Sequence, residues 1–203
     1  LTLENVQDAD WETSWKQYYK PLPIGERLLV VPQWEAETPE VQAASACRVP
    51  LILDPGLTFG TGSHATTRLC LTALERRIQG GERVLDLGCG SGILSIAALR
   101  RDNAALNGIG PDTYTVRVGD LFTDEGFRAS LGGGYDILLA NIVADVIIAL
   151  APFVRSLLRP GGLFLCSGII DTRAGEVAEA IRQSGLTLLE QQEADGWCAY
   201  TCR

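Results

Sequence analysis

One stretch decides the fold of this 203-residue chain: Val84-Leu85-Asp86-Leu87-Gly88-Cys89-Gly90-Ser91-Gly92. A short apolar run contains an acid near its end, three alternating glycines follow, and a helical pattern begins at Ile93. Glycine permits a tight turn and a close approach of a ligand to the backbone, while the start of a helix presents unpaired N–H groups. The motif therefore predicts a strand, a turn and a helix, with a nucleotide-like ligand at the end of the first strand of an open α/β sheet.

The spacing of the glycines separates two classes of nucleotide-binding turn. A dinucleotide fingerprint reads G-x-G-x-x-G, but the third glycine would fall at position 93, which is Ile93. The pattern here, D-x-G-x-G-x-G, resembles the first motif of S-adenosylmethionine (SAM)-dependent methyltransferases of the Rossmann-like class. The motif thus favours SAM over a nicotinamide dinucleotide, and a structural turn without a ligand remains a third interpretation.

The chain after Gly81 alternates apolar strands with helices. Strands are expected at residues 84–87, 114–118, 135–140 and 163–167, helices at 142–158 and 173–184, and a closing antiparallel pair at 186–190 and 197–202. Such alternation predicts a mostly parallel sheet that is covered on both faces. The expected fold class is α/β: a Rossmann-like, doubly wound, seven-stranded, mostly parallel sheet with an antiparallel edge strand and a short N-terminal extension.

Residues 1–48 differ from the rest in composition, because they hold three of the four tryptophans. A strand is expected at residues 27–32, and the polar residues 35–46 indicate a linker or an exposed hairpin. We expect residues 1–48 to be an N-terminal extension and residues 49–203 to be a SAM-dependent methyltransferase domain. In the latter, a helix over residues 63–78 would begin with Ser63 as its N-cap.

Composition narrows the function classes. A net charge of −8 disfavours direct binding of nucleic acid, which needs clustered Lys and Arg. The six cysteines form no C-x-x-C pair, so we expect buried thiols in a reducing compartment and no metal site. No apolar run reaches the roughly 18 residues of a membrane span, and the first ten residues do not resemble a signal peptide. The expected location is the cytoplasm, without membrane contact.

The region after the glycines is too short for the helices and strands that the expected fold places there. Only 27 residues separate Gly92 from Asp120, whereas a helix, a strand, a second helix and a further strand need roughly 40. The missing element is the second strand, whose tip normally carries the acid that binds the ribose hydroxyls. The chain also contains no methionine. We therefore expect that the sequence omits residues of the natural chain near Arg100 and Arg101.

A second segment, DPGLTFGTGSHATT at residues 54–67, resembles the hallmark of the ribosomal protein L-eleven methyltransferases, the PrmA family. Other segments that resemble the family follow the same order along the chain, at residues 10–15, 25–28, 140–142, 150–152, 167–169 and 196–198. The resemblance implies a SAM-dependent enzyme that N-methylates lysine and N-terminal amino groups of large-subunit ribosomal protein eleven. In the family a substrate-recognition domain precedes the segment at Asp10, and its absence here leaves the acceptor open.

Four residues near the two motifs are candidates for binding the cofactor. Gly88 and Gly90 would let the backbone approach the ribose and methionine parts of SAM, or serve only as turn residues. Asp86 would orient the turn through hydrogen bonds to the backbone or to the SAM amine. The resemblance places the hydroxyl of Thr67 on the cofactor, with a helix-capping role as the alternative.

Two further candidates for binding the cofactor, Phe59 and Asn141, could also contact the acceptor. Phe59, in a glycine-rich loop, could cover the cofactor or the target alkyl chain, or anchor its loop in the core. Asn141 ends a strand at the switch point of the sheet, where its amide could accept from an incoming amine or bind the methionine end of SAM. His64, the only histidine, could act as a base, but a loop-capping role is favoured. The pattern assigns no catalytic residue.

Three other functions stay open at this point. The chain could be a SAM methyltransferase with another protein or a small amine as acceptor, or a SAM-binding protein without turnover. A nicotinamide oxidoreductase is the third, but it would need a glycine in place of Ile93.

Overall fold

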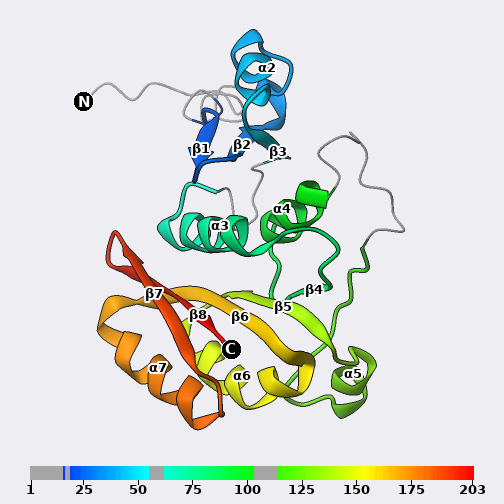
Figure 1. Cartoon of the computed structure of the whole chain (residues 1–203), viewed down its shortest axis with the longest axis vertical. Coiled ribbons are helices and arrows are strands. Elements are labelled where there is room, and N and C mark those ends of the chain that lie inside the picture. Colours follow the sequence, from blue (N-terminus) through cyan, green and yellow to red (C-terminus); the bar gives the residue numbers. More distant parts are fainter. Residues whose placement is uncertain (1–15, 17–18, 55–61, 103–113) are drawn as a thin grey trace, which may run out of the picture.

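The structure, a computed structural model, describes residue 16 and residues 19–54, 62–102 and 114–203. These residues form a central sheet between two layers of helices, with a smaller sheet beyond one helical layer (Figure 1). The central sheet has the strand order β4-β5-β6-β8-β7. Its strands are β4 (Val84–Asp86), β5 (Tyr135–Asn141), β6 (Leu158–Ile170), β7 (Leu188–Ala194) and β8 (Trp197–Cys202).

The directions of the strands confirm the predicted α/β class. β4, β5 and β6 run parallel, whereas β8 is antiparallel to both of its neighbours, β6 and β7. The closing antiparallel pair is therefore confirmed. The expected count of seven strands is not confirmed: within the described residues the sheet has five strands.

One predicted strand, residues 114–118, is wrong. The segment has the alternating pattern of a strand, yet it forms no ladder, and Val118 is 98% exposed. Arg117 donates through Nη1 to the carbonyl oxygen of Ser130 at 2.9 Å, which fixes the segment to α5 (Glu125–Ser130). A pattern of alternating side chains forms a strand only where a neighbouring strand offers its backbone. Within the described residues, β4 has no neighbour on this side and is an edge strand.

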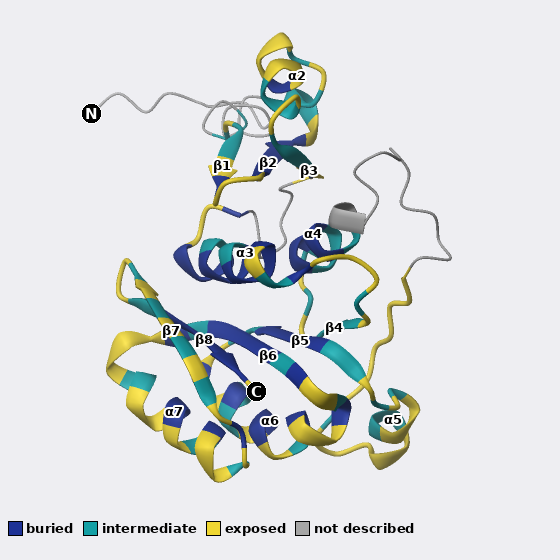
Figure 2. Cartoon of the chain, viewed as in Figure 1, coloured by how far each residue is buried: buried dark blue, intermediate teal, exposed yellow. Residues whose placement is uncertain are grey.

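Alternating residues of β5 fill two separate cores, one on each face of the sheet. Ile137 and Leu139 pack toward α3 (Ala65–Arg77) and α4 (Ile93–Asp102). Leu138 and Ala140 pack toward α6 (Ala144–Leu157) and α7 (Ala174–Gln183), which follows a short 3-10 helix, η4 (Asp171–Arg173). Figure 2 shows the buried residues on the sheet and on the inner sides of these helices. The period of two along β5 thus explains the helical layers on both faces.

The smaller sheet has the order β1-β2-β3, built from β1 (Leu22–Ile24), β2 (Leu28–Pro32) and β3 (Val49–Leu53). β1 and β2 form an antiparallel hairpin, whereas β3 lies parallel to β2. The pairing of β2 with β3 joins the segment before residue 48 to the segment after it. The division into domains at that residue stays a prediction.

The expected linker or hairpin at residues 35–46 is wrong, because most of it is helical. A 3-10 helix, η2 (Gln33–Glu35), leads into α2 (Pro39–Ser45), whose first position is proline. Thr38 is the N-cap, and its Oγ1 accepts from the amide of Val41 at 3.4 Å. Val41 then packs against the side of β2 that faces away from α3. A threonine followed by proline and an acid is a helix-start signal that explains this element.

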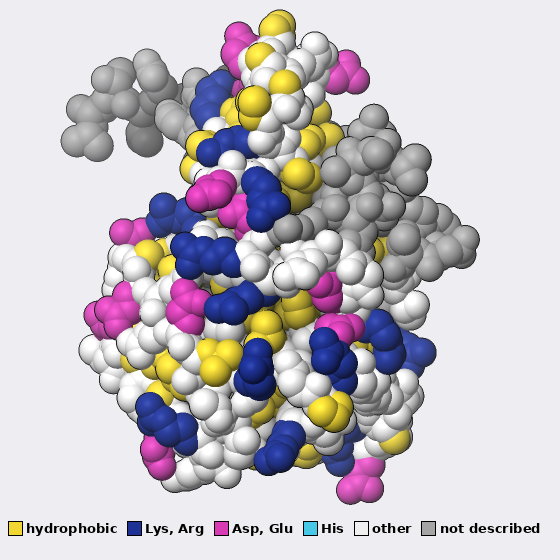
Figure 3. All heavy atoms as spheres, in the orientation of Figure 1, with side chains coloured by type: hydrophobic (Ala, Val, Ile, Leu, Met, Phe, Trp, Pro, Cys, Tyr) yellow, Lys and Arg dark blue, Asp and Glu magenta, His cyan; other side chains and the backbone are white. Residues whose placement is uncertain are grey.

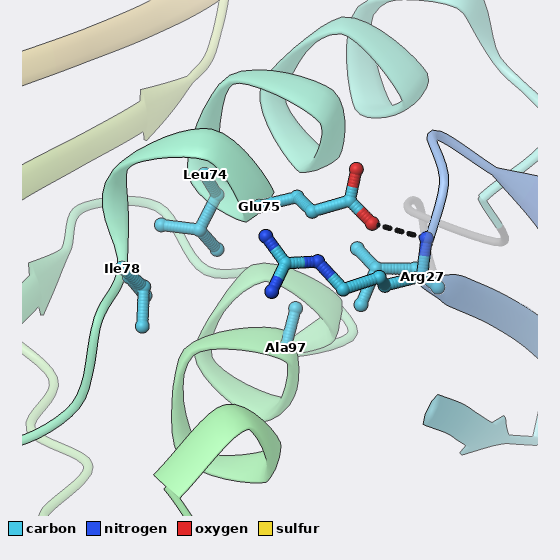
Figure 4. A pocket seen from close by; sticks show the side chains of 6 residues that line it. Arg27, Leu74, Glu75, Ile78 and Ala97 are labelled. Carbon is cyan, nitrogen blue, oxygen red and sulfur yellow. Dashed lines mark hydrogen bonds between the residues drawn. The ribbon is translucent and has the colours of Figure 1, made fainter. Parts of the chain in front are cut away.

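Glu75 of α3 fastens the β1–β2 hairpin to the rest of the molecule. Its carboxylate accepts from the backbone amides of Glu26 at 3.1 Å and Arg27 at 2.5 Å. Figure 4 shows this carboxylate directed at the backbone of Arg27, beside a cavity of about 40 Å³ between α3 and α4. Gly25 has φ of +55°, and a Cβ atom there would lie 2.1 Å from Glu75 Oε2. The turn therefore needs glycine for its conformation and for the space that Glu75 occupies.

The surface carries charges of both signs. On the face that Figure 3 shows, Lys and Arg side chains alternate with Asp and Glu, and no broad area of one sign stands out. Ion pairs connect α3 to β7: Arg76 and Arg77 both bind Glu190, at 3.2 and 2.9 Å. In the described part of the chain, no helix is long and apolar enough to cross a membrane.

Candidate functional site

The turn between β4 and α4 has the conformation that its glycines permit. Gly88, Gly90 and Gly92 have φ of +73°, +53° and +76°, a region that L side chains rarely adopt. A Cβ atom on Gly88 would also lie 2.8 Å from Cγ2 of Ile142. The amide of Gly92 donates to the carbonyl of Cys89 at 2.8 Å, and α4 starts at once, because the amide of Ile96 donates to Gly92 at 2.8 Å. The predicted sequence of strand, turn and helix is confirmed.

Asp86, the last residue of β4, points a carboxylate at the first turn of α4. Ser95 Oγ donates to Asp86 Oδ2 at 2.7 Å. The other oxygen, Oδ1, is buried and has no hydrogen-bond partner among the described residues. A buried acceptor without a partner costs roughly 1–3 kcal/mol, so this oxygen has the capacity to accept a hydrogen bond from a further group.

Burial raises the pKa of Asp86 above its ordinary value, and hydrogen bonding by Ser95 opposes that rise. Two thiols lie close enough to feel the carboxylate charge. Burial, and secondarily Asp86, raise the pKa of Cys70 to about 12 and also raise the pKa of Cys89. Both thiols are therefore neutral near pH 7.

Thr67 and Asn141 meet across the interface between α3 and the sheet. Asn141 ends β5, and its Nδ2 donates to Oγ1 of Thr67 at 3.2 Å. Thr67 is buried in the first turn of α3, so its hydroxyl is held in place by the helix. The two candidates thus form a single polar unit at the carboxyl edge of the parallel strands.

The backbone beside Asn141 is closely packed. Asn141 pairs with Ser167 of β6, and the amide of Ile142 donates to the carbonyl of Ser167 at 3.0 Å. Gly168 has φ of +93°, and a Cβ there would lie 2.2 Å from the carbonyl oxygen of Ile142. Glycine at 168 is therefore required for the strand end that presents Asn141.

The start of α3 also contacts the β7–β8 turn. His64, not the expected Ser63, is the N-cap of α3: its Nδ1 accepts from the Thr66 amide at 3.4 Å and lies 2.9 Å from Thr66 Oγ1. The His64 ring packs edge-on against Trp197 at 4.9 Å between centroids. Arg68 forms an ion pair with Asp195 in the turn. These contacts support the predicted capping role of His64.

Five of the six predicted residues lie in the described part of the chain. Asp86, Gly88 and Gly90 share one turn, and Thr67 is bonded to Asn141. Phe59 lies outside the described residues.

The sequence analysis missed Ser95, which stands in an apolar helical pattern and is recognisable only by its place one turn into the helix that follows the glycines. Asp120 binds the Phe122 amide and the Thr123 hydroxyl of its own turn, at 2.7 and 2.6 Å.

A larger open groove of about 540 Å³ runs between β1, α3 and β7. Neither this groove nor the small cavity beside Glu75 is lined by Asp86, Gly88 or Asn141. No group of three or more metal-ligating side chains is present within the described residues. The candidate site is instead the carboxyl edge of the sheet, which is marked by the glycine turn, the buried Oδ1 of Asp86 and the bond between Asn141 and Thr67.

Comparison with known proteins identifies the family of the chain. Residues 1–203, its whole length, match the profile of the family described as "Ribosomal protein L11 methyltransferase (PrmA)". The chain belongs to this family. A ribosomal protein L11 methyltransferase of Desulfitobacterium hafniense is 41% identical over 216 residues, which cover 98% of this chain and 65% of that protein. One of Bacillus subtilis is 37% identical, over 97% of this chain and 66% of the relative. The chain spans about two thirds of the length of the curated relatives it matches.

Solved structures agree with the PrmA assignment. The crystal structure of a ribosomal protein L11 methylase from Lactobacillus delbrueckii subsp. bulgaricus superposes with a TM-score of 0.75 and 28% identity, over 91% of this chain and 98% of that one. A Burkholderia thailandensis 1,6-didemethyltoxoflavin-N1-methyltransferase gives a TM-score of 0.57 at 16% identity, over 91% and 99% of the two chains. The latter is a likeness of fold alone, and both confirm the Rossmann-like methyltransferase class.

The PrmA relatives contain residues that this chain lacks. The alignment with the Agathobacter rectalis protein runs over 226 positions and covers all 203 residues here. Some positions inside the matched region therefore have no counterpart in this chain, and the omission of residues near Arg100 and Arg101 stays a prediction. The expected junction, Arg100–Arg101, lies within α4.

Proposed function

We propose that this chain is the SAM-dependent catalytic part of a protein N-methyltransferase that acts on ribosomal protein L11. Membership of the PrmA family and the glycine turn at the end of β4 support the proposal. The acceptors are lysine side chains and an N-terminal amino group, and the activity is cytoplasmic. Residues 49–203 form the methyltransferase domain, with residues 1–48 as an extension that packs on it.

The residues at the carboxyl edge of the sheet fit the cofactor. When bound, SAM supplies a methyl group on a positively charged sulfur. Gly88 and Gly90 allow the backbone to approach this ligand without an intervening Cβ atom. The buried Oδ1 of Asp86 matches the ammonium group of its methionine part, because that oxygen lacks a hydrogen bond within the described structure.

Asn141 and Thr67 form the second part of the proposed site. The bond from Asn141 Nδ2 to Thr67 Oγ1 fixes the plane of the amide. We assign the remaining amide oxygen to an amine, either of the acceptor or of the methionine end. Phe59, an aromatic residue in a glycine-rich loop, is proposed to cover the cofactor or the alkyl chain of the acceptor.

An acceptor lysine must lose its proton before it can accept a methyl group. With an ordinary pKa of about 10.4, removing the proton at pH 7 costs about 4 kcal/mol. A pocket of low dielectric lowers that pKa, so alignment and exclusion of water suffice without a strong base. His64 caps α3 and contacts Trp197, which supports a structural role. We therefore assign no catalytic base.

The single structural observation that carries the proposed SAM site is the unsatisfied Asp86 Oδ1 beside a left-handed glycine turn, whereas the proposed acceptor rests on the family. Calorimetry of the 203-residue chain with SAM and S-adenosylhomocysteine tests it, followed by transfer of a tritiated methyl group to ribosomal protein L11. We expect binding and transfer for the unaltered chain. A chain that binds neither compound overturns the proposal, and binding without transfer to any amine favours a SAM-binding protein without turnover.

A matched pair of variants shows where the ligand binds. Gly88→Ala places a Cβ 2.8 Å from Ile142 Cγ2 at a φ of +73°, whereas Gly81→Ala has a φ of +82° but meets nothing within 4 Å. We expect Gly88→Ala to abolish SAM binding and Gly81→Ala to keep it. Equal affinities for the two variants would place the ligand elsewhere.

A further inference from the structure

Ser95 holds one oxygen of Asp86 and leaves the other without a partner. We propose that Ser95 is a positioning residue for the cofactor: by donating to Oδ2 it favours the carboxylate form of Asp86 and directs Oδ1 to the ammonium group of the ligand. The inference rests on the proposed function for the identity of that ligand. The action of Ser95 on Asp86 itself is a property of the protein alone.

The glycine turn places the Ser95 hydroxyl. Ile93 and Leu94, the first two residues of α4, are buried, with 3% of each exposed, so the helix cannot rotate about its axis without losing this packing. The hydrogen bond from Ile96 to Gly92 sets the start of the helix at the glycine turn. Ser95 therefore reaches back over the turn to the end of β4, and a change in the turn would move its hydroxyl.

No other described group supports the carboxylate form of Asp86. Burial disfavours the charged form, and within the described structure Ser95 is the one residue that lowers the Asp86 pKa. Cys70 faces it from α3 and Cys89 from the turn, but both pKa values are raised, so neither thiol carries a charge below pH 8. The described residues form no ion pair between Asp86 and an Arg or Lys. Two neutral groups of one residue, the hydroxyl of Ser95 first and its backbone amide second, thus oppose the desolvation of this acid.

The first experiment needs no ligand. The carboxyl carbon of Asp86 is titrated by ¹³C NMR in the ligand-free chain, with Asp86→Asn to identify the signal. We expect a higher pKa for Asp86 in Ser95→Ala than in the unaltered chain, and a value close to the unaltered one in Ser95→Thr, which keeps the hydroxyl. Ser156→Ala is the matched control, because Ser156 donates to Phe153 on an exposed face of α6, at 2.7 Å. An unchanged Asp86 pKa in Ser95→Ala overturns the proposal.

The second experiment measures the affinity for SAM against pH by calorimetry. Binding should weaken as the pH falls through the Asp86 pKa of the free chain. In a plot of affinity against pH, this decrease (the acid limb) should occur at higher pH in Ser95→Ala than in the unaltered chain. At pH 7 we expect affinity about tenfold lower in Ser95→Ala, the size expected when a hydrogen bond to a charged group is lost. Ser95→Thr should restore both readouts.

The two proposals fail in different ways. If the unaltered chain binds no SAM at any pH, the proposed function is wrong, and the NMR titration alone decides whether Ser95 sets the ionisation of Asp86. If SAM binds and its acid limb is the same in Ser95→Ala as in the unaltered chain, the positioning role is wrong while the proposed function stands.

Discussion

The amide of Asn141 donates to the hydroxyl of Thr67 at 3.2 Å, although the two residues are 74 positions apart in the sequence. This bond joins the end of β5 to the first turn of α3. It places two side chains that the sequence predicts at the site in a fixed mutual position, and it is the point where the helix and the sheet share a polar contact near the glycine turn.

Removal of the Thr67 hydroxyl should affect both stability and binding. Thr67→Val keeps the shape of the buried side chain but leaves the Asn141 amide without its acceptor. We expect a loss of about 1 kcal/mol in the free energy of unfolding, and about tenfold weaker SAM binding. Thr67→Ser keeps the hydroxyl and should retain most of the affinity. Urea unfolding and calorimetry measure the two effects, and SAM affinity unchanged in Thr67→Val would remove this residue from the proposed site.

The turn at Gly25 should be less tolerant than the turn at Gly81. Both have positive φ, but a Cβ on Gly25 meets Glu75 Oε2 at 2.1 Å, while one on Gly81 meets nothing within 4 Å. Glu75 can move only by releasing the amides of Glu26 and Arg27. We therefore expect Gly25→Ala to cost about 1–3 kcal/mol more than Gly81→Ala in unfolding free energy.

A double-mutant cycle isolates the contact. In the background of Glu75→Ala, the extra cost of Gly25→Ala should disappear, because the carboxylate that occupies the space is absent. If the cost of Gly25→Ala is the same in both backgrounds, the turn conformation rather than Glu75 determines it.

Gly168→Ala should be among the most damaging single changes to the site. The added Cβ would lie 2.2 Å from the carbonyl oxygen of Ile142, which is backbone and belongs to the turn after Asn141. We expect a loss of about 2 kcal/mol or more, from the clash and from the strained φ of +93°. Gly132→Ala, at φ of +68° with open space around it, is the control. Similar melting temperatures for the two variants would contradict this account of the strand end.

Asp86→Asn should stabilise the ligand-free chain more at pH 8 than at pH 4. The folded state raises the Asp86 pKa, so the folded chain binds more protons than the unfolded chain above pH 3.8. Protonation of Asp86 therefore favours the folded state over the unfolded state. This contribution to stability is present in full below pH 3.8 and is lost as the pH rises through the pKa that Asp86 has in the folded chain. Asparagine removes this loss, and it should also abolish SAM binding. Urea unfolding at the two pH values tests the prediction, and a pH-independent difference between the chains would refute it.

The sequence predicts the elements whose patterns are long or unambiguous. The apolar run with its three glycines identifies β4, the turn and α4, and the alternation of strands and helices predicts two-sided coverage of the sheet. The features that the sequence does not predict depend on contacts between residues that are distant in the sequence. Residues 114–118 have the pattern of a strand but no neighbouring strand in the described sheet, so Val118 is left exposed. Ser95 is invisible as a site residue because its role comes from a carboxylate nine positions away.

A local signal, unlike overall composition, predicts α2. Thr38 and Pro39 announce the start of α2, which a reading of composition alone mistakes for a linker. The bond between Thr67 and Asn141 could not be predicted in this way, since it exists only after α3 has packed on the sheet.

Helix α3 carries Thr67 near its first turn and Glu75 near its last, about 12 Å apart along the axis at 1.5 Å per residue. At one end, Thr67 is hydrogen-bonded to Asn141 at the end of β5. At the other end, Glu75 is hydrogen-bonded to the backbone of the β1–β2 hairpin. One helix thus contacts both parts of the molecule. A partner that binds the N-terminal strands would therefore be linked through α3 to the Thr67 hydroxyl, at the place where we propose that the methyl donor binds.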